Sequence, residues 1–141
     1  MMMRYLSILF FLMSGIAGYT IDKLGQDLCL SDYIAVGTIT YFKELQGVSA
    51  NDPSMLSICG IFSIIFSVIL ILIKNKYLYL TVIFILFILE FIFMNMMETA
   101  SYTEIIYDSI TKCSNLSVLG WVAGQLIGLI GSICYIFKNN E

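Results

Sequence analysis

A single carboxylate inside an apolar segment is the residue of this 141-residue chain best placed to do chemistry. Glu90 lies between Leu89 and Phe91, within an apolar segment over residues 77–97. A carboxylate in hydrocarbon is costly, so such a residue is by default a functional candidate that faces a bundle interior or a wet cavity. Its functional form would be a proton or cation site. Its structural form would be a protonated acid that hydrogen-bonds polar side chains on neighbouring helices.

Three other polar residues fall at a similar depth in their own apolar segments. Counted inward from the outer end of each segment, Ser14, Ser63 and Gln125 lie close to the level of Glu90. We therefore predict an intramembrane polar layer of Glu90, Gln125, Ser63 and Ser14, in which Glu90 hydrogen-bonds Gln125 and a serine. A lone carboxylate without histidine, beside substantial outer loops, favours structural hydrogen bonding. Proton- or cation-coupled transport is the alternative.

The chain lacks the residues on which most enzymes depend. It has no histidine, which excludes Ser-His and Cys-His nucleophilic pairs and the commonest metal ligand. It also has no Cys-x-x-Cys motif, so thiol oxidoreductase chemistry lacks its usual signature. The acidic residues show no spacing typical of a calcium loop. We predict a protein with no catalytic residues, no metal site and no cofactor.

Four apolar segments must position the polar layer. They cover about residues 5–21, 55–73, 77–97 and 116–137, and each has the roughly 20 residues that a helix needs to cross a bilayer. The chain is 60% hydrophobic and 12% charged, whereas charged residues make up about a quarter of soluble domains. The sequence predicts an all-α integral membrane protein, with residues 1–141 forming one four-transmembrane-helix bundle. We expect the hairpin of residues 55–97, joined by Lys74-Asn75-Lys76, to be its packing centre.

The first segment has two interpretations. A basic residue, an apolar run and Gly15-Ile16-Ala17 together resemble a signal peptide with a small-residue cleavage site. Against this, Ser7, Ser14 and Gly18 recur on one helical face, as small residues do where membrane helices pack closely. This stripe favours a retained first helix.

Basic residues indicate the orientation of the bundle. With both termini in the cytoplasm, four basic residues fall in very short inner segments, and three are spread over the long outer loops of residues 22–54 and 98–115. The density of Lys and Arg near helix ends sets topology, so cytoplasmic termini are predicted. The inner residues are Arg4, Lys74, Lys76 and Lys138, and the outer ones are Lys23, Lys43 and Lys112. Most acidic residues then lie outside, and this negative face argues against nucleic acid as a partner.

The outer loops carry signals of local structure. Cys29 and Cys113 fall one in each loop, and an extracellular or periplasmic compartment would let them form a disulfide; two free thiols are the alternative. Residues 33–42 are rich in β-branched and aromatic residues, which predicts a small β-hairpin with Gly37 at a turn or bulge; an extended loop on the membrane surface is the alternative. Asp52 is expected to cap the second helix ahead of Pro53. Residues 98–115 are expected to begin with a helical extension of the third segment.

Small residues mark two helix faces for close packing. They recur at helical spacing as Gly60, Ser63 and Ser67 in the second segment, and as Gly120, Gly124 and Gly128 in the fourth. Small residues let helix backbones approach each other. These residues are predicted to pack inside the bundle, with contact between protomers of a homo-oligomer as the alternative.

Four short stretches within residues 55–141 carry a family resemblance. They are Met55-Leu56-Ser57-Ile58, Ile64-Ile65-Phe66-Ser67, Leu119-Gly120-Trp121-Val122-Ala123 and Tyr135-Ile136-Phe137-Lys138. Together with the predicted topology, they resemble the claudin and peripheral-myelin-protein superfamily of four-helix membrane proteins. The first outer loop departs from that family's pattern, because it has no Trp and only one cysteine. The resemblance implies a non-enzymatic protein of cell membranes, acting in junctions, in adhesion or as an auxiliary channel subunit.

The expected function is therefore contact and not catalysis. We expect a multi-pass protein of the plasma membrane or the bacterial inner membrane that acts through its acidic outer loops and lateral helix faces. Its partners would be the lipid bilayer and another membrane, extracellular or periplasmic protein, or a second copy of itself. One alternative is a bacterial inner-membrane immunity or exclusion protein that neutralises a pore-forming toxin. Another is a small proton- or cation-coupled transporter that uses Glu90.

Overall fold

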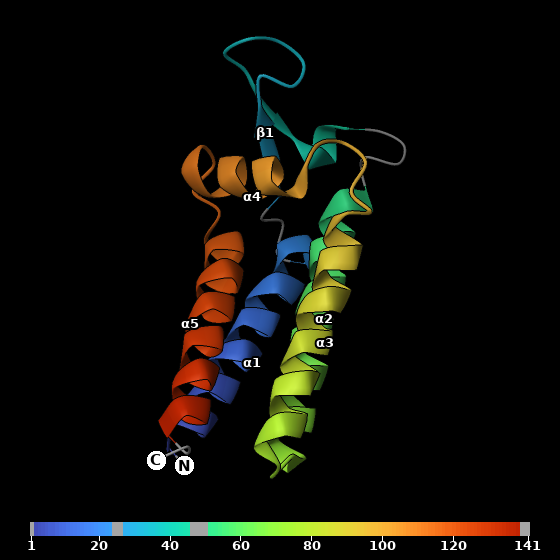
Figure 1. Cartoon of the computed structure of the whole chain (residues 1–141). Helices are drawn as coiled ribbons and strands as arrows, with labels where there is room; N and C mark the ends of the chain where they lie inside the picture. Colours follow the sequence, from blue (N-terminus) through green and yellow to red (C-terminus); the bar gives the residue numbers. More distant parts are fainter. Residues whose placement is uncertain (1, 24–26, 46–50, 139–141) are drawn as a thin grey trace.

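The structure, a computed structural model, describes residues 2–23, 27–45 and 51–138. Within them, four helices are long and apolar enough to cross a membrane: α1 (Met2–Lys23), α2 (Asp52–Leu72), α3 (Lys76–Met94) and α5 (Leu116–Lys138). They run side by side, and a short helix, α4 (Tyr102–Thr111), lies across one end of the bundle (Figure 1). The predicted four-helix architecture is therefore present, with a fifth helix that the sequence reading did not separate from the third.

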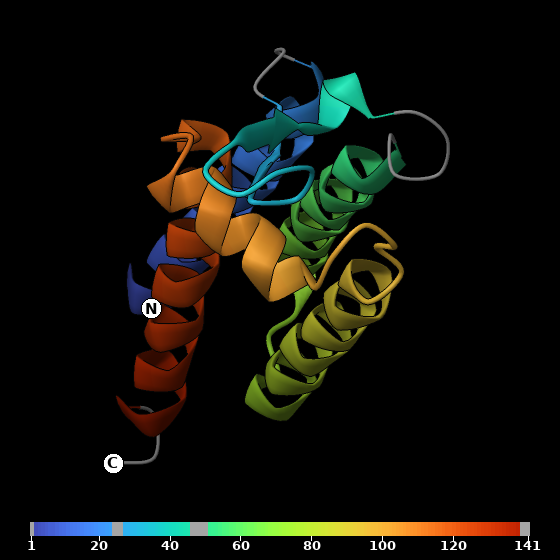
Figure 2. The ribbon, with the colours of Figure 1, turned by 90° about the horizontal axis from the view of Figure 1, so that it is seen from above.

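Helix α1 occupies the centre of the bundle, between α2 and α5 (Figure 2). Glycines make this arrangement possible, because a side chain at these points would collide with the neighbouring backbone. A Cβ atom at Gly60 of α2 would lie 2.4 Å from the amide nitrogen of Tyr19, and one at Gly124 of α5 would lie 3.0 Å from the carbonyl oxygen of Phe10. Residues 2–23 are therefore an integral part of the packed core.

The fourth-segment glycines face this central helix. Gly120, Gly124 and Gly128 approach Ala17, Ser14 and Phe11 of α1 in that order. In the second segment, Gly60 packs on α1, and the buried Ser67 donates a hydrogen bond to the carbonyl of Ser63, 2.6 Å away. The small residues predicted for packing thus serve contacts within one chain.

The hairpin of residues 55–97 is not the packing centre, contrary to the expectation from sequence. Helix α3 packs mainly on α2, and its outer face is exposed, with Phe84 and Phe91 each more than half accessible. The physical reason lies in side-chain size. Residues 77–97 contain no Gly, Ala or Ser, so the bulky α3 cannot approach a backbone as closely as the glycine-bearing faces of α2 and α5 approach α1.

One end of the bundle carries a folded cap, defined here as residues 27–45 and 98–115 in their described parts. Strands β1 (Cys29–Ser31) and β2 (Ile39–Tyr41) form an antiparallel hairpin with Cys29 opposite Tyr41, and a 3₁₀ turn, η1 (Phe42–Glu44), follows. The predicted hairpin is present, although most of residues 33–42 form its connecting loop. Residues 24–26 and 46–50, which belong to the same predicted outer loop, lie outside the described residues.

Two local expectations about helix ends were wrong. Helix α3 ends at Met94 and does not extend into the cap; α4 begins separately after Ser101, whose hydroxyl accepts the Glu104 amide. Asp52 does not cap α2. Its carboxylate instead accepts the backbone amides of Glu98 and Thr99, at 3.3 and 3.1 Å. The carboxylate therefore ties the start of α2 to the chain that leaves α3.

The cap is fastened to itself by a disulfide and by buried hydrogen bonds. Cys29 and Cys113 are bridged, as predicted, which joins β1 to the end of α4. The buried Asp108 of α4 accepts both the amide and the hydroxyl of Ser31 at 2.8 Å, and Ser109 accepts the amide of Cys29 at 3.1 Å. Because these contacts link two segments far apart in sequence, the hairpin is held in one orientation over α4.

Candidate functional site

Three polar side chains from three helices meet inside the bundle. Ser63 of α2 donates to Oε1 of Glu90 on α3 at 2.6 Å, and Nε2 of Gln125 on α5 lies 2.8 Å from the same oxygen. Nε2 also lies 2.6 Å from the Ser63 hydroxyl. Glu90 and Gln125 are 2% and 6% exposed, and Ser63 is fully buried. Buried polar groups need partners, so this cluster supplies a specific link between helices that otherwise make apolar contacts.

Ser14, the fourth residue predicted for this layer, does not join the cluster. Its hydroxyl donates to the backbone carbonyl of Trp121 at 2.7 Å, which fastens α1 to α5. Depth along a helix places a residue at a level, whereas its rotation about the helix axis decides which neighbour it meets. Ser14 lies against Gly124 of α5, and the two residues are so close that position 124 has no space for a side chain.

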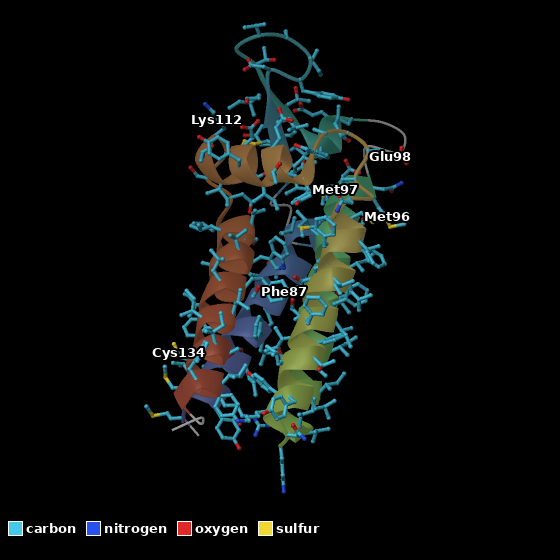
Figure 3. All side chains as sticks on the ribbon, in the orientation of Figure 1. Phe87, Met96, Met97, Glu98, Lys112 and Cys134 are labelled. Atoms are coloured by element: carbon cyan, nitrogen blue, oxygen red, sulfur yellow. A yellow bond between two sulfur atoms is a disulfide. The ribbon has the colours of Figure 1, made fainter. Side chains whose placement is uncertain are left out.

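A hollow of about 390 Å³ lies beside Glu90, between α3, α4 and α5. Aromatic residues from all three helices line it, among them Phe87, Tyr102, Tyr107 and Trp121. Phe87 projects toward the space between α3 and the α1–α5 pair, where its ring contacts that of Phe11 edge to face (Figure 3). A second hollow of about 390 Å³ lies on the other side of Phe87, between α3 and Leu129 of α5. Helices α3 and α5 therefore meet at the Glu90–Gln125 and Tyr79–Ser132 contacts, and a lateral groove separates them between these points.

Two buried polar atoms next to the cluster have no hydrogen-bond partner among the described residues. They are Oε1 of Gln125 and Nε1 of Trp121, and both residues line the first hollow. A buried group without a partner is unfavourable, so these atoms mark the place where the chain is least satisfied.

A second polar cluster, which the sequence reading missed, lies near the other end of the bundle. Ser7 of α1 and Ser132 of α5 are 2.5 Å apart through their hydroxyls, and both donate to the carbonyl of Gly128. The hydroxyl of Tyr79 on α3 reaches Ser132 at 3.2 Å. The depths of Ser7 and Ser132 in their apolar segments are a sequence signal for this cluster. Tyr79 carries no such signal, because a tyrosine near a segment end is an ordinary interfacial residue.

Arg4 also has a structural role that its charge alone did not reveal. Its guanidinium donates to the carbonyls of Leu70 and Ile71 at 2.8 and 2.9 Å, and to that of Ile73. These carbonyls end α2, where helix geometry leaves acceptors without intrahelical donors and where the helix dipole is negative. The arginine therefore completes the end of α2 from a neighbouring helix.

The most exposed apolar side chains of the cap lie at the tip of the β1–β2 hairpin. Ile34 is 72% exposed and Val36 is 95% exposed, beside Tyr33. The tip is ordered by its own hydrogen bonds: Asp32 accepts the amide of Gly37 through its side chain, at 2.5 Å, and its amide donates to Thr38 at 2.9 Å. Gly37 has a φ of +81°, which glycine adopts without strain.

The cap also holds its charged groups in defined positions. Asp27 accepts the backbone amide of Lys43 at 2.5 Å, and the side-chain amide of Asn115 donates to the Asp27 carbonyl at 3.0 Å. Partial burial raises the pKa of the Asp27 carboxyl above its ordinary value, against the opposing effect of the backbone amides of Lys43 and Leu28. These contacts place the start of β1 against the start of α5.

The described residues contain no group of three or more acidic, cysteine or histidine side chains arranged to hold a metal ion. Within them, the Glu90 carboxyl lies beside a serine and an amide, and the Cys59 thiol donates to the backbone carbonyl of Glu90 at 3.7 Å. The arrangement can bind and orient a group that donates hydrogen bonds. Comparison of the chain with protein-family models, curated proteins and solved structures found no match.

Proposed function

We propose that this chain is a four-span membrane protein that acts by binding another protein through the tip of its cap. The observation that carries the proposal is the exposure of Ile34 and Val36 on a loop that is closed by its own hydrogen bonds. Aliphatic side chains at an ordered, projecting tip gain free energy when a partner covers them, and little conformational entropy is lost because the loop is already ordered.

The support of the hairpin strengthens this interpretation. The tip stands at the far end of the molecule from the start of α1 and the end of α5 (Figure 1). The disulfide and the hydrogen bonds of Asp108 fix the strands on α4, so the two apolar side chains are presented in one geometry. Preorganisation of this kind lowers the entropic cost of binding a partner.

The proposed orientation places the cap outside the cell or in the periplasm. A disulfide persists in an oxidising compartment, and Cys29–Cys113 belongs to the cap. Lys74 and the α2–α3 joint lie at the opposite end, in agreement with the preference of basic residues for the cytoplasmic side. In this orientation the partner is an extracellular, periplasmic or membrane protein. Adhesion, a role as an auxiliary subunit and immunity to a toxin are all functions that such a contact could serve.

Site-specific photo-crosslinking in intact cells tests the proposal. A photoreactive residue at Val36 is expected to capture one defined partner, whereas the same residue at the exposed Thr111 of α4 is expected not to capture it. A product of twice the mass of the chain would identify the partner as a second copy.

Charge substitutions supply the matched control. Ile34→Asp with Val36→Asp is expected to abolish capture of the partner, while Thr111→Asp with Lys112→Asp leaves it intact. Both double variants should retain the disulfide and the helix content of the parent chain. Undiminished binding of the captured partner by the tip variant would contradict the proposal.

A further inference from the structure

The hollow beside Glu90 has the shape of a ligand site within the lateral groove. Its volume of about 390 Å³ falls in the range typical of small-molecule pockets, and its walls are almost wholly apolar. Helix α4 forms its roof, since Tyr102, Ile106 and Ile110 line it from above. Figure 2 shows α4 crossing the end of the bundle between α5 and α3. Because α4 closes this end of the hollow, a helix of a partner protein, about 10–12 Å across, could not pass through it.

The electrostatic character of the hollow is one-sided. Of the described residues that line it, Glu90 is the sole acidic one, and none is a lysine or an arginine. Among the described residues no cationic side chain pairs with Glu90, whose partners are the neutral Ser63 and Gln125. A buried carboxylate is stabilised by a cation that is buried with it. Because the described side chains provide no such cation for Glu90, a bound ligand could provide it.

The polar atoms at the hollow that lack a partner include both acceptors and a donor. Oε2 of Glu90 takes part in neither of the two hydrogen bonds that Oε1 accepts, and Oε1 of Gln125 accepts none among the described residues. A donor on a ligand would satisfy these two oxygens, whereas Nε1 of Trp121 is a donor without a partner in the same lining. The aromatic rings of Phe87, Tyr102, Tyr107 and Trp121 surround the same space, and ring faces attract cations.

We propose that this hollow binds an apolar ammonium ion, with its N–H groups directed to Glu90 and Gln125 and its apolar body among the aromatic rings. The class of ligand is a protonated amine on a compact hydrocarbon body. The lateral opening between α3 and α5 lets such a molecule enter from the side of the bundle, past Phe87 and the second hollow.

The chain contains one tryptophan, Trp121, and it lines the hollow, so its fluorescence reports occupancy directly. The experiment titrates the full chain in mild detergent with 1-aminoadamantane, which is protonated at neutral pH. The matched control ligand is 1-adamantanol, which has the same apolar body without the charge. Saturable change of Trp121 fluorescence is expected with the amine, and binding of the alcohol is expected to be weaker by about tenfold or more.

Two variants separate recognition from folding. Glu90→Gln keeps the shape of the side chain and is expected to weaken amine binding by about tenfold or more while leaving alcohol binding unchanged. Val122→Phe fills the hollow from α5 without touching the polar cluster and is expected to remove binding of both ligands. Equal binding of amine and alcohol would overturn the proposal. So would unchanged amine binding in a folded Glu90→Gln chain, or the absence of amine binding by equilibrium dialysis.

Discussion

Gly60 of α2 and Gly15 of α1 approach each other so closely that neither position can hold a methyl group. A Cβ atom at Gly15 would lie 2.7 Å from the carbonyl oxygen of Gly60, and a Cβ atom at Gly60 would lie 2.7 Å from the carbonyl oxygen of Gly15. The obstacle on both sides is backbone, which cannot rotate away. The α1–α2 distance is therefore set by these two glycines.

We expect Gly60→Ala to lower the free energy of unfolding by about 3 kcal/mol, because the helices must separate to admit the methyl group. Gly120→Ala is the matched control. Its added Cβ would lie 3.2 Å from the Cβ of Ala17, a contact that a helix shift of a few tenths of an ångström relieves, and it should cost about 1 kcal/mol or less. Reversible unfolding in mixed detergent micelles measures both values. Equal losses in the two variants would contradict the assignment.

The polar cluster should behave as one energetic unit. A double-mutant cycle of Glu90→Ala and Gln125→Ala is expected to show a coupling of about 0.5–2 kcal/mol, since each residue loses a partner when the other is removed. The control cycle pairs Glu90→Ala with Ser14→Ala, which should be additive because Ser14 bonds the Trp121 carbonyl instead. Additivity of the first cycle would show that Glu90 and Gln125 do not depend on each other.

Arg4 is expected to contribute to stability through the end of α2. Replacing it by alanine leaves the carbonyls of Leu70 and Ile71 without its hydrogen bonds and should cost about 1.5–3 kcal/mol, measured by the same unfolding assay. Lys74→Ala removes an exposed basic residue from the same end of the bundle and should change stability little. A comparable loss for Lys74→Ala would mean that charge alone, and not capping, explains the effect.

The state of the cysteines gives a direct test of the cap. Under denaturing conditions an alkylating reagent should modify two cysteines of the unreduced chain, Cys59 and Cys134, and all four after reduction. The number of adducts is read by intact mass. Four adducts without reduction would show that Cys29 and Cys113 are free thiols in the native protein.

The first helix is expected to remain in the mature protein. Gly15 and Gly18 lie against Gly60, so removal of residues 2–21 would leave α2 and α5 without the helix that both pack on. The N-terminal sequence of the chain purified from membranes measures this, and it should precede α1. An N-terminus shortly after Ala17 would show that the segment is a cleaved signal peptide.

The four long apolar helices and the Glu90 cluster could be predicted from the sequence for simple reasons. Apolar length decides whether a segment can form a spanning helix, and depth counted from the segment ends placed Glu90, Ser63 and Gln125 at one level. Depth could not separate Ser14 from that group, because the rotation of α1 about its own axis depends on which glycines of the neighbouring helices it contacts. The central place of α1 was missed for the same reason: it follows from Gly15, Gly18 and Gly60 meeting in space, which no local pattern encodes.

Contacts between distant segments account for the remaining differences. Asp52 has the type and position of a helix cap, and only the return of the chain at Glu98 and Thr99 offers its carboxylate better donors. Helix α4 is a short amphipathic element whose apolar face needs the bundle end beneath it. Tyr79 gains its hydrogen bonds only because Ser132 of α5 and Ser7 of α1 lie opposite its hydroxyl.

The Cys29–Cys113 bridge has a consequence for how the protein is made. Its two cysteines are separated by 84 positions, and all of α2 and α3 lies between them. In the proposed orientation, the bond would form only after the α2–α3 hairpin had been inserted into the membrane and α4 had been translocated. Oxidation of this pair would then record that insertion had passed the third helix, and a chain trapped earlier would carry an unpaired Cys29.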